Sequence, residues 1–169
     1  MKISKNLKDK VFTKEILVSL TIIIVTFVLD RLSKISVIRK QMDNDVSFFV
    51  NNYLNFDLVW NTGIGFGLFS QNAGIYYQVT SFLIFLVIIY LSYLIIKSNY
   101  SDKILFSLIL GGALGNFYDR LFYLAVPDFI DIHINNYHWF TFNIADIFIT
   151  VGVIFLIGKD LIVKKNENY

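Results

Sequence analysis

The chain has 169 residues, of which 56% are hydrophobic and 17% aromatic, and its mean hydropathy is +0.59. Because one soluble core of this length would need far less apolar surface, the composition indicates an integral membrane protein, with a single compact domain over residues 1–169. The net charge of +2, without a basic stripe, argues against a nucleic-acid partner, and the absence of cysteine excludes disulfides and thiolate chemistry.

The first predicted element is a transmembrane helix over about residues 16–38. Five lysines in the first 14 residues precede an apolar run, as in a signal peptide, but no small-residue cleavage site follows. The run instead continues past Asp30 and Lys34, so we interpret it as an uncleaved helix. These two residues lie four apart on one helical face. They form either a mutually neutralised pair near the membrane surface or part of a substrate-binding site.

Residues 39–74 change to an alternating pattern, which predicts a small β-region on the outer side of the membrane. A short strand at 48–50 and a turn at Asn51–Asn52 precede the alternating stretch. The apolar side of that stretch consists of Leu54, Phe56, Leu58 and Trp60. Asn61 ends it, where a carboxamide can hold a peptide main chain by donating and accepting at once. Gly63, Gly65 and Gly67 then allow either a structural turn or close approach to a bound chain.

The second and third spans are predicted at about 75–96 and 104–123. Gly111 and Gly115 of the third span form a GxxxG pair, which is typical of a helix-packing contact. Gly112, Asn116 and Arg120 recur every four residues, so they lie on one face that points into the bundle.

The fourth span is predicted at about 142–163, which gives an all-α membrane protein with four transmembrane helices in an up-down arrangement and a small extracytoplasmic β-sheet. The basic residues then gather on one side of the membrane. We therefore expect both termini in the cytoplasm, with residues 39–74 and 121–141 outside. The basic residues on the cytoplasmic side are Lys2 to Lys14, Lys97, Lys103, Lys159, Lys164 and Lys165.

The residues of these elements could in principle support several kinds of chemistry. Ser33 and Lys34 are neighbours that point apart on a helix, which excludes a serine–lysine pair. His133 and His138, with nearby acidic residues, lack an HExxH or comparable spacing, so we expect interfacial histidines, no metal site and no cofactor. The other acidic residues weighed as ligands are Asp128 and Asp131. Transport through the buried charges is the alternative from a different class, although there is no repeat or broken-helix pair to favour it.

Paired carboxylates offer hydrolysis without a metal or a nucleophilic side chain. Two aspartates that share a proton have apparent pKa values pushed apart, which leaves one acid and one base in the site. Asp146 is one candidate because it opens a span one turn after Asn143. Its partner is either Asp119 or Asp128. Asp119 adjoins Arg120, which favours an ion-paired structural role, whereas Asp128 lies in an extended segment that can lean over Asp146.

These residues resemble the ordered motif set of the lipoprotein signal peptidase family, also called signal peptidase II, over nearly the whole chain. The motifs are DRLSK at 30–34, NTGIGFG at 61–67, GGALGNFYDR at 111–120, PDF at 127–129 and FNIAD at 142–146. The resemblance implies four transmembrane helices, an extracytoplasmic sheet and a short amphipathic segment. It also implies a bacterial intramembrane aspartyl endopeptidase that cleaves diacylglyceryl-modified prolipoproteins just before the lipidated cysteine.

By the same resemblance, Asp128 and Asp146 are the catalytic aspartates, and Asp119 is a supporting group. Two positions depart from the commonest family pattern, since Pro127 replaces a valine and Gly65 a slightly larger residue. We expect the enzyme to act as a monomer among membrane lipids of the cytoplasmic membrane, with its site near the outer leaflet. The residues expected to line or support the substrate pocket are Asp30, Lys34, Asn61, Gly63, Asn116, Arg120 and Asn143.

Overall fold

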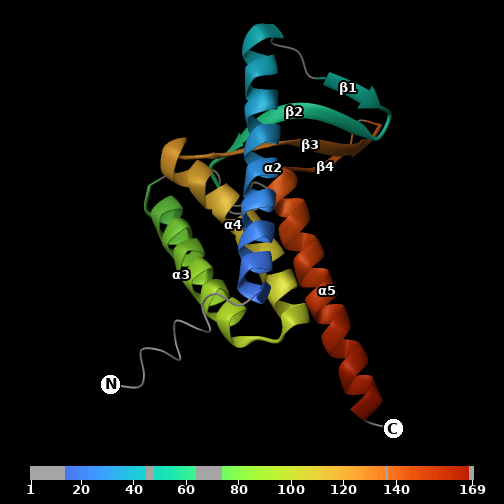
Figure 1. Cartoon of the computed structure of the whole chain (residues 1–169). Coiled ribbons are helices and arrows are strands. Elements are labelled where there is room, and N and C mark those ends of the chain that lie inside the picture. Colours follow the sequence, from blue (N-terminus) through green and yellow to red (C-terminus); the bar gives the residue numbers. More distant parts are fainter. Residues whose placement is uncertain (1–13, 45–47, 64–73, 136, 168–169) are drawn as a thin grey trace.

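The computed structural model describes residues 14–44, 48–63, 74–135 and 137–167, which form a helical bundle with an antiparallel sheet at one end (Figure 1). The described helices are α2 (Lys14–Asn44), α3 (Ile75–Lys97), α4 (Tyr100–Phe122) and α5 (Ile144–Glu167). The described strands are β1 (Phe48–Asn51), β2 (Leu54–Asn61), β3 (Val126–Ile134) and β4 (Tyr137–Phe142). The start of α2 and the end of α5 lie at the end of the bundle opposite the sheet.

Helix α4 is the central element of the bundle and packs against α2, α3 and α5. Two of its glycines permit the close approach. A Cβ added at Gly111 would lie 2.7 Å from Cβ of Thr26 on α2, and one at Gly112 would lie 2.6 Å from the Ala145 carbonyl oxygen on α5. The interpretation of Gly111 as part of a helix-packing GxxxG motif is therefore confirmed.

The sheet has the order β1-β2-β3-β4, with all neighbours antiparallel. The predicted β-region at 39–74 is only half of it, because β3 and β4 come from the segment between α4 and α5. Residues 39–44 are not in that region but continue α2, since Arg, Lys, Gln and Met at 39–42 favour a helix. The register also shifts between Phe56 and Val59, so the alternation predicted for β2 is interrupted by a bulge.

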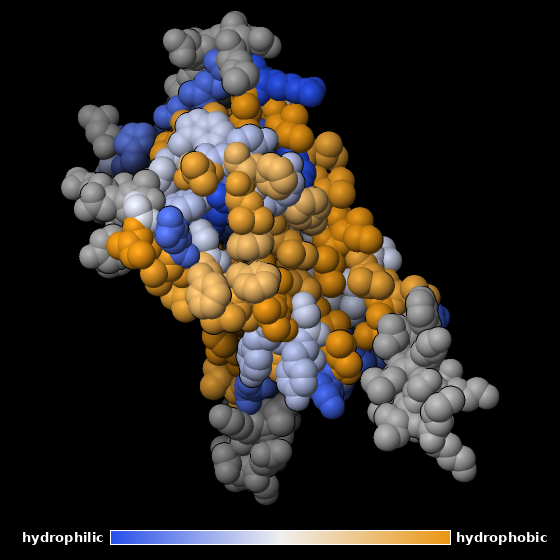
Figure 2. Space-filling view, turned by 90° about the vertical axis from the view of Figure 1, so that its left-hand side faces the viewer, coloured by the Kyte–Doolittle hydropathy of each residue, from blue (hydrophilic) through white to orange (hydrophobic). Residues whose placement is uncertain are grey.

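Among the described residues, α2 and α3 each contain a stretch long and apolar enough to cross a membrane. At 31 residues, α2 is about 46 Å long, which exceeds the roughly 30 Å hydrocarbon core of a bilayer. Figure 2 shows apolar side chains in a band between two polar ends. Large side chains of α3 such as Phe82 and Leu83 are more than half exposed, which suits contact with lipid.

Helix α5 begins at Ile144, two residues after the approximate start predicted for the fourth span. Phe142 ends β4, and Asn143 joins the strand to the helix. No separate short amphipathic helix is present in the described ranges. The residues 64–73, and with them Gly65 and Gly67, lie outside those ranges.

Candidate active site

Asp128 and Asp146 reach one site from different elements, and Asn143 connects them. The Asn143 side-chain nitrogen donates to Oδ1 of Asp128 at 2.6 Å. Its backbone N–H donates to Oδ2 of Asp146 at 3.1 Å, and the Asp146 N–H donates back to Oδ1 of Asn143 at 3.1 Å. This reciprocal pair is a capping box at the start of α5, so the motif that begins the helix also fixes both carboxylates.

The Asp128 carboxylate is almost fully buried, at 3% exposure, and both of its oxygens accept hydrogen bonds. Asn143 donates to one oxygen, and the side-chain nitrogen of Asn61 donates to the other at 2.9 Å. Burial, followed by the negative charge of nearby Asp146, raises the pKa of Asp128 to about 6, against the lowering effect of the two amides. Asp128 therefore changes between its protonated and ionised forms at about pH 6.

Hydrogen bonds of Arg120 and Asn61 hold the end of β2 in place, and Arg120 connects it to α4 of the bundle. Oδ1 of Asn61 accepts from the Gly63 N–H at 2.9 Å, and the Arg120 guanidinium donates to the Gly63 carbonyl oxygen. The same guanidinium lies 5.4 Å from the ring centre of Tyr77 on α3, whose hydroxyl donates to the Arg120 carbonyl. The sequence carried no signal for Tyr77, because its contact depends on how α3 packs against α4.

A second group of charges lies on the adjoining faces of α2 and α4. Lys34 is fully buried, and its ammonium donates to Asp30 at 2.8 Å, to Asn116 at 2.8 Å and to Asp119 at 2.7 Å. Asp119 also pairs with Arg31, a residue that the sequence interpretation missed although it lies inside the DRLSK motif. The expectation that Asp119 is ion-paired is confirmed, but its partners are these α2 cations rather than the adjacent arginine.

The two groups of polar residues form one continuous network. Asn116 accepts from Lys34 through its carbonyl oxygen and donates to Oδ1 of Asp146 at 2.8 Å through its nitrogen. Asp30 accepts from the Ala145 N–H at 3.0 Å, next to Asp146. The network contains every residue proposed from the sequence for the pocket, namely Asp30, Lys34, Asn61, Gly63, Asn116, Asp119, Arg120, Asp128, Asn143 and Asp146.

The chemistry available to Asp128 and Asp146 is general acid–base catalysis. Two nearby carboxylates in a low-dielectric site do not both ionise readily, so the pair tends to share one proton. One carboxylate can then accept a proton from water while the other donates a proton to a carbonyl oxygen.

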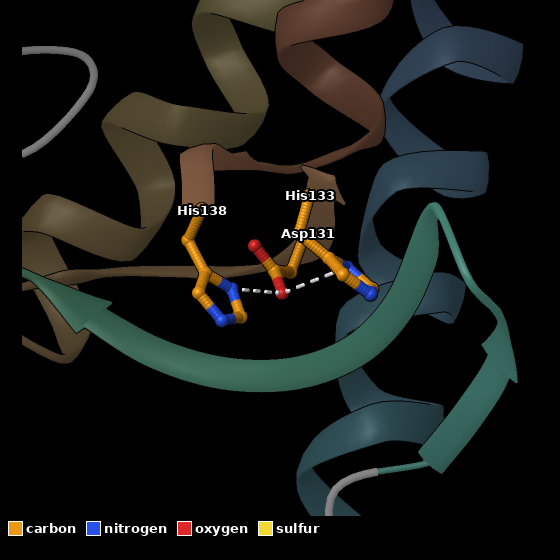
Figure 3. A group of neighbouring side chains, drawn as sticks. All are labelled: Asp131, His133 and His138. Carbon is orange, nitrogen blue, oxygen red and sulfur yellow. Dashed lines mark hydrogen bonds and ion pairs between the residues drawn. The ribbon is translucent and has the colours of Figure 1, made fainter. Parts of the chain in front are cut away.

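The two histidines, expected from the sequence to be ordinary interfacial residues, lie on the paired strands β3 and β4. Asp131, His133 and His138 form a cluster on β3 and β4, with the carboxylate between the two imidazoles (Figure 3). The spacing of these residues in the sequence did not predict the cluster, because the two histidines meet only through the pairing of the strands, where His133 lies opposite His138.

Comparison with known proteins gives a consistent result. Residues 22–162 match the family described as signal peptidase (SPase) II. The chain is 44% identical over 154 residues to a lipoprotein signal peptidase of Pelagibacter ubique (strain HTCC1062), covering 90% of this chain and 93% of the relative. It is 48% identical over 122 residues to one from Francisella tularensis subsp. novicida (strain U112), covering 70% and 76%.

Two solved structures described as bacterial membrane enzymes share the fold. One has a TM-score of 0.74 at 30% identity and covers 89% of this chain and 92% of its own. The other has a TM-score of 0.72 at 33% identity and covers 86% and 94%.

Proposed function

The chain belongs to the signal peptidase II family, and we propose that it removes signal peptides from lipid-modified prolipoproteins with Asp128 and Asp146 as its catalytic pair. Cleavage takes place just before the lipidated cysteine of a diacylglyceryl-modified precursor. The observation that carries the assignment of the pair is the bridge formed by Asn143, which holds both carboxylates through hydrogen bonds.

The proposed reaction uses one proton shared by the two aspartates. The ionised carboxylate takes a proton from water as the water oxygen bonds to the scissile carbonyl carbon, and the protonated carboxyl donates to the carbonyl oxygen. When the tetrahedral intermediate collapses, the C–N bond breaks, the leaving nitrogen takes a proton from the protonated aspartate, and one hydroxyl of the intermediate returns its proton to the ionised aspartate as the carbonyl re-forms. Asn61, Asn116 and Asn143 keep the carboxylates oriented through this cycle.

The proposal extends to the arrangement in the membrane. In the proposed arrangement all four helices cross the bacterial cytoplasmic membrane and both termini are cytoplasmic. The sheet and the catalytic pair lie near the outer leaflet. Two observations support this arrangement. Lys14, Lys97 and Lys103 lie at or near helix ends on the side of the bundle opposite the sheet, and the apolar band lies between the polar ends (Figure 2). A monomer suffices, because both aspartates come from one chain.

The test of the catalytic pair is cleavage of a synthetic lipopeptide by purified protein in detergent. Asp128→Asn and Asp146→Asn should each remain folded but lose at least about 1,000-fold in kcat, since each removes an acid–base group. Asp57→Asn makes the same chemical change at an exposed position of β2 and should retain full activity.

Full activity in either active-site variant would refute the assignment of the pair. A transporter that used the buried charges would cleave nothing in detergent, where no gradient exists. Failure of the unsubstituted protein to cleave would therefore count against the peptidase itself.

A further inference from the structure

The sheet carries a second polar cluster that the proposed peptidase reaction does not use. Both imidazoles approach the same carboxylate oxygen: Nδ1 of His138 lies 2.7 Å from Oδ2 of Asp131, and Nδ1 of His133 lies 3.6 Å from it (Figure 3). The imidazole ring centres are 5.2 Å apart. The three ligand atoms all lie within 4.8 Å of one another, so they converge on one small volume.

Two buried polar atoms, one in the cluster and one on the neighbouring strand β2, lack hydrogen-bond partners within the described part of the chain. Nδ1 of His133 has no hydrogen-bond partner, although the residue is only 7% exposed. Oδ1 of Asn55 is also buried without a partner. Asn55 lies directly opposite Asp131 in the β2–β3 register, which puts the two side chains on one face of the sheet. Buried polar groups in folded proteins are rarely left unpaired, so both atoms are available to bind a ligand.

We propose that Asp131, His133 and His138 bind a divalent transition-metal ion of the zinc class, with Oδ1 of Asn55 or a water molecule as the fourth ligand. Ligands of a tetrahedral Zn²⁺ at about 2.0–2.1 Å lie about 3.3 Å apart, which falls between the two imidazole–carboxylate separations of 2.7 and 3.6 Å. Two imidazoles and one carboxylate suit zinc rather than calcium or magnesium, which prefer oxygen ligands alone.

The surroundings of the cluster allow an ion to enter. The His138 side chain is 59% exposed. A cavity of about 230 Å³ opens beside the cluster and is lined by His133, Ile134, Tyr137 and Trp139. An ordinary Asp131–His138 hydrogen bond would account for one imidazole but would leave Nδ1 of His133 and Oδ1 of Asn55 without hydrogen-bond partners.

The proposed ion has a structural role in the sheet. It joins β3 to β4, and β2 as well if Asn55 is a ligand, close to the turn between β3 and β4. Asp131 and Asp128 lie three residues apart on the same strand, so an ion at this end of β3 restrains the strand that carries the proposed catalytic aspartate without touching the reaction.

The test is zinc binding by the full-length protein in detergent after chelator treatment and removal of any polyhistidine tag. Titration against a chromophoric zinc indicator should give about one zinc per chain, and zinc should raise the unfolding temperature. His138→Ala and His133→Phe should each weaken binding by at least about tenfold and abolish the temperature shift. Asp57→Asn removes an exposed carboxylate from β2 and should bind zinc as the parent does.

Cobalt substitution gives a second measurement. A tetrahedral site with nitrogen and oxygen ligands should produce visible d–d absorption that both histidine variants lose. The proposal is overturned if the parent binds no stoichiometric zinc, or if both histidine variants bind it with the parent's affinity. Because these measurements do not involve cleavage, they remain valid even if the assignment of the catalytic pair fails.

Discussion

Three asparagines each join a carboxylate to a second partner in this site. Asn61 donates to Asp128 and accepts from a backbone N–H, whereas Asn116 donates to Asp146 and accepts from an ammonium. Asn143 donates to Asp128 and accepts from a backbone N–H. A carboxamide donates through its nitrogen and accepts through its oxygen without adding charge, whereas an ionised aspartate can only accept, so aspartate could not replace asparagine at these positions.

Comparison of Asn143→Ala with a second cap variant should separate the effect of orienting Asp128 from the effect of losing a helix cap. The substitution removes the donor to Asp128 and the cap of α5, so we expect kcat to fall about 100-fold and the free energy of unfolding to fall by about 1 kcal/mol. Asn99→Ala is the matched control, because Asn99 caps α4 by accepting from the Asp102 N–H at 3.1 Å. It should cost similar stability and leave kcat unchanged. Equal cleavage activity in the two variants would contradict the prediction that Asn143 orients Asp128.

The raised pKa of Asp128 predicts a pH dependence of stability. Its pKa of about 6 lies above the usual 3.8, so folding favours the protonated form. The stabilisation from protonated Asp128 is fully present below pH 3.8 and is lost as the pH rises through 6. A shift of about 2 units corresponds to about 3 kcal/mol.

Asp128→Asn removes the titrating group and therefore provides the comparison. Between pH 4 and 7, the free energy of unfolding of the parent should fall relative to that of the variant, measured in mixed detergent at each pH. Parallel curves for the two proteins would contradict the raised pKa. The kcat/KM of the parent should decline above about pH 6, where the pair loses its shared proton.

At the scale of whole elements, the position of Asp146 depends on how closely α4 and α5 approach. A methyl group at Gly112 would meet the Ala145 carbonyl oxygen at 2.6 Å and Ile149 at 2.9 Å, and backbone cannot rotate out of the way as a side chain can. Gly112→Ala should therefore push α5 from α4, lower the free energy of unfolding by about 1–3 kcal/mol and reduce cleavage.

Gly158→Ala provides the control on α5, because a Cβ there would meet no atom within 4 Å. In that variant alanine should leave cleavage unchanged and stabilise the helix slightly. The comparison is made by thermal unfolding and lipopeptide cleavage in the same detergent. If Gly112→Ala behaved like Gly158→Ala, tight packing between α4 and α5 would not control the site.

The sequence predicted the helices well because an apolar run is a local property. The polar face of α4 was also predictable, since Gly112, Asn116 and Arg120 follow the helical period. The pairing of β2 with β3 was not predictable, because it joins residues about 70 positions apart and depends on register. For the same reason the sequence placed Asp119 next to Arg120 but could not show that Lys34 and Arg31 of α2 neutralise it.

At the scale of the whole molecule, the charges of the network balance only if the catalytic pair keeps one proton. The network contains three cations and four aspartates, so four ionised aspartates would leave a net charge of −1 among buried groups. A charge in a low-dielectric interior is costly, and one proton on the Asp128–Asp146 pair restores neutrality. The groups counted are Arg31, Lys34, Arg120, Asp30, Asp119, Asp128 and Asp146.

The same balance makes stability sensitive to Lys34, which is fully buried and pairs with Asp30 and Asp119. Lys34→Met leaves Asp30 without its cation and removes one of the two cations that pair with Asp119, so the free energy of unfolding should fall by about 3–5 kcal/mol, measured in mixed detergent. Lys159→Met breaks an ion pair with the partly exposed Asp102 and should cost at most about 1 kcal/mol.

Adding Asp119→Asn to Lys34→Met removes one negative charge along with the lost positive one. The double variant should therefore recover part of the stability that Lys34→Met loses, although Asp119→Asn alone destabilises the protein by leaving an excess cation on α2. Such recovery shows that charge balance, and not the volume of the lysine side chain, sets the cost. If the two losses simply added, the charges would act independently, and neutrality would not be what keeps a proton on the catalytic pair.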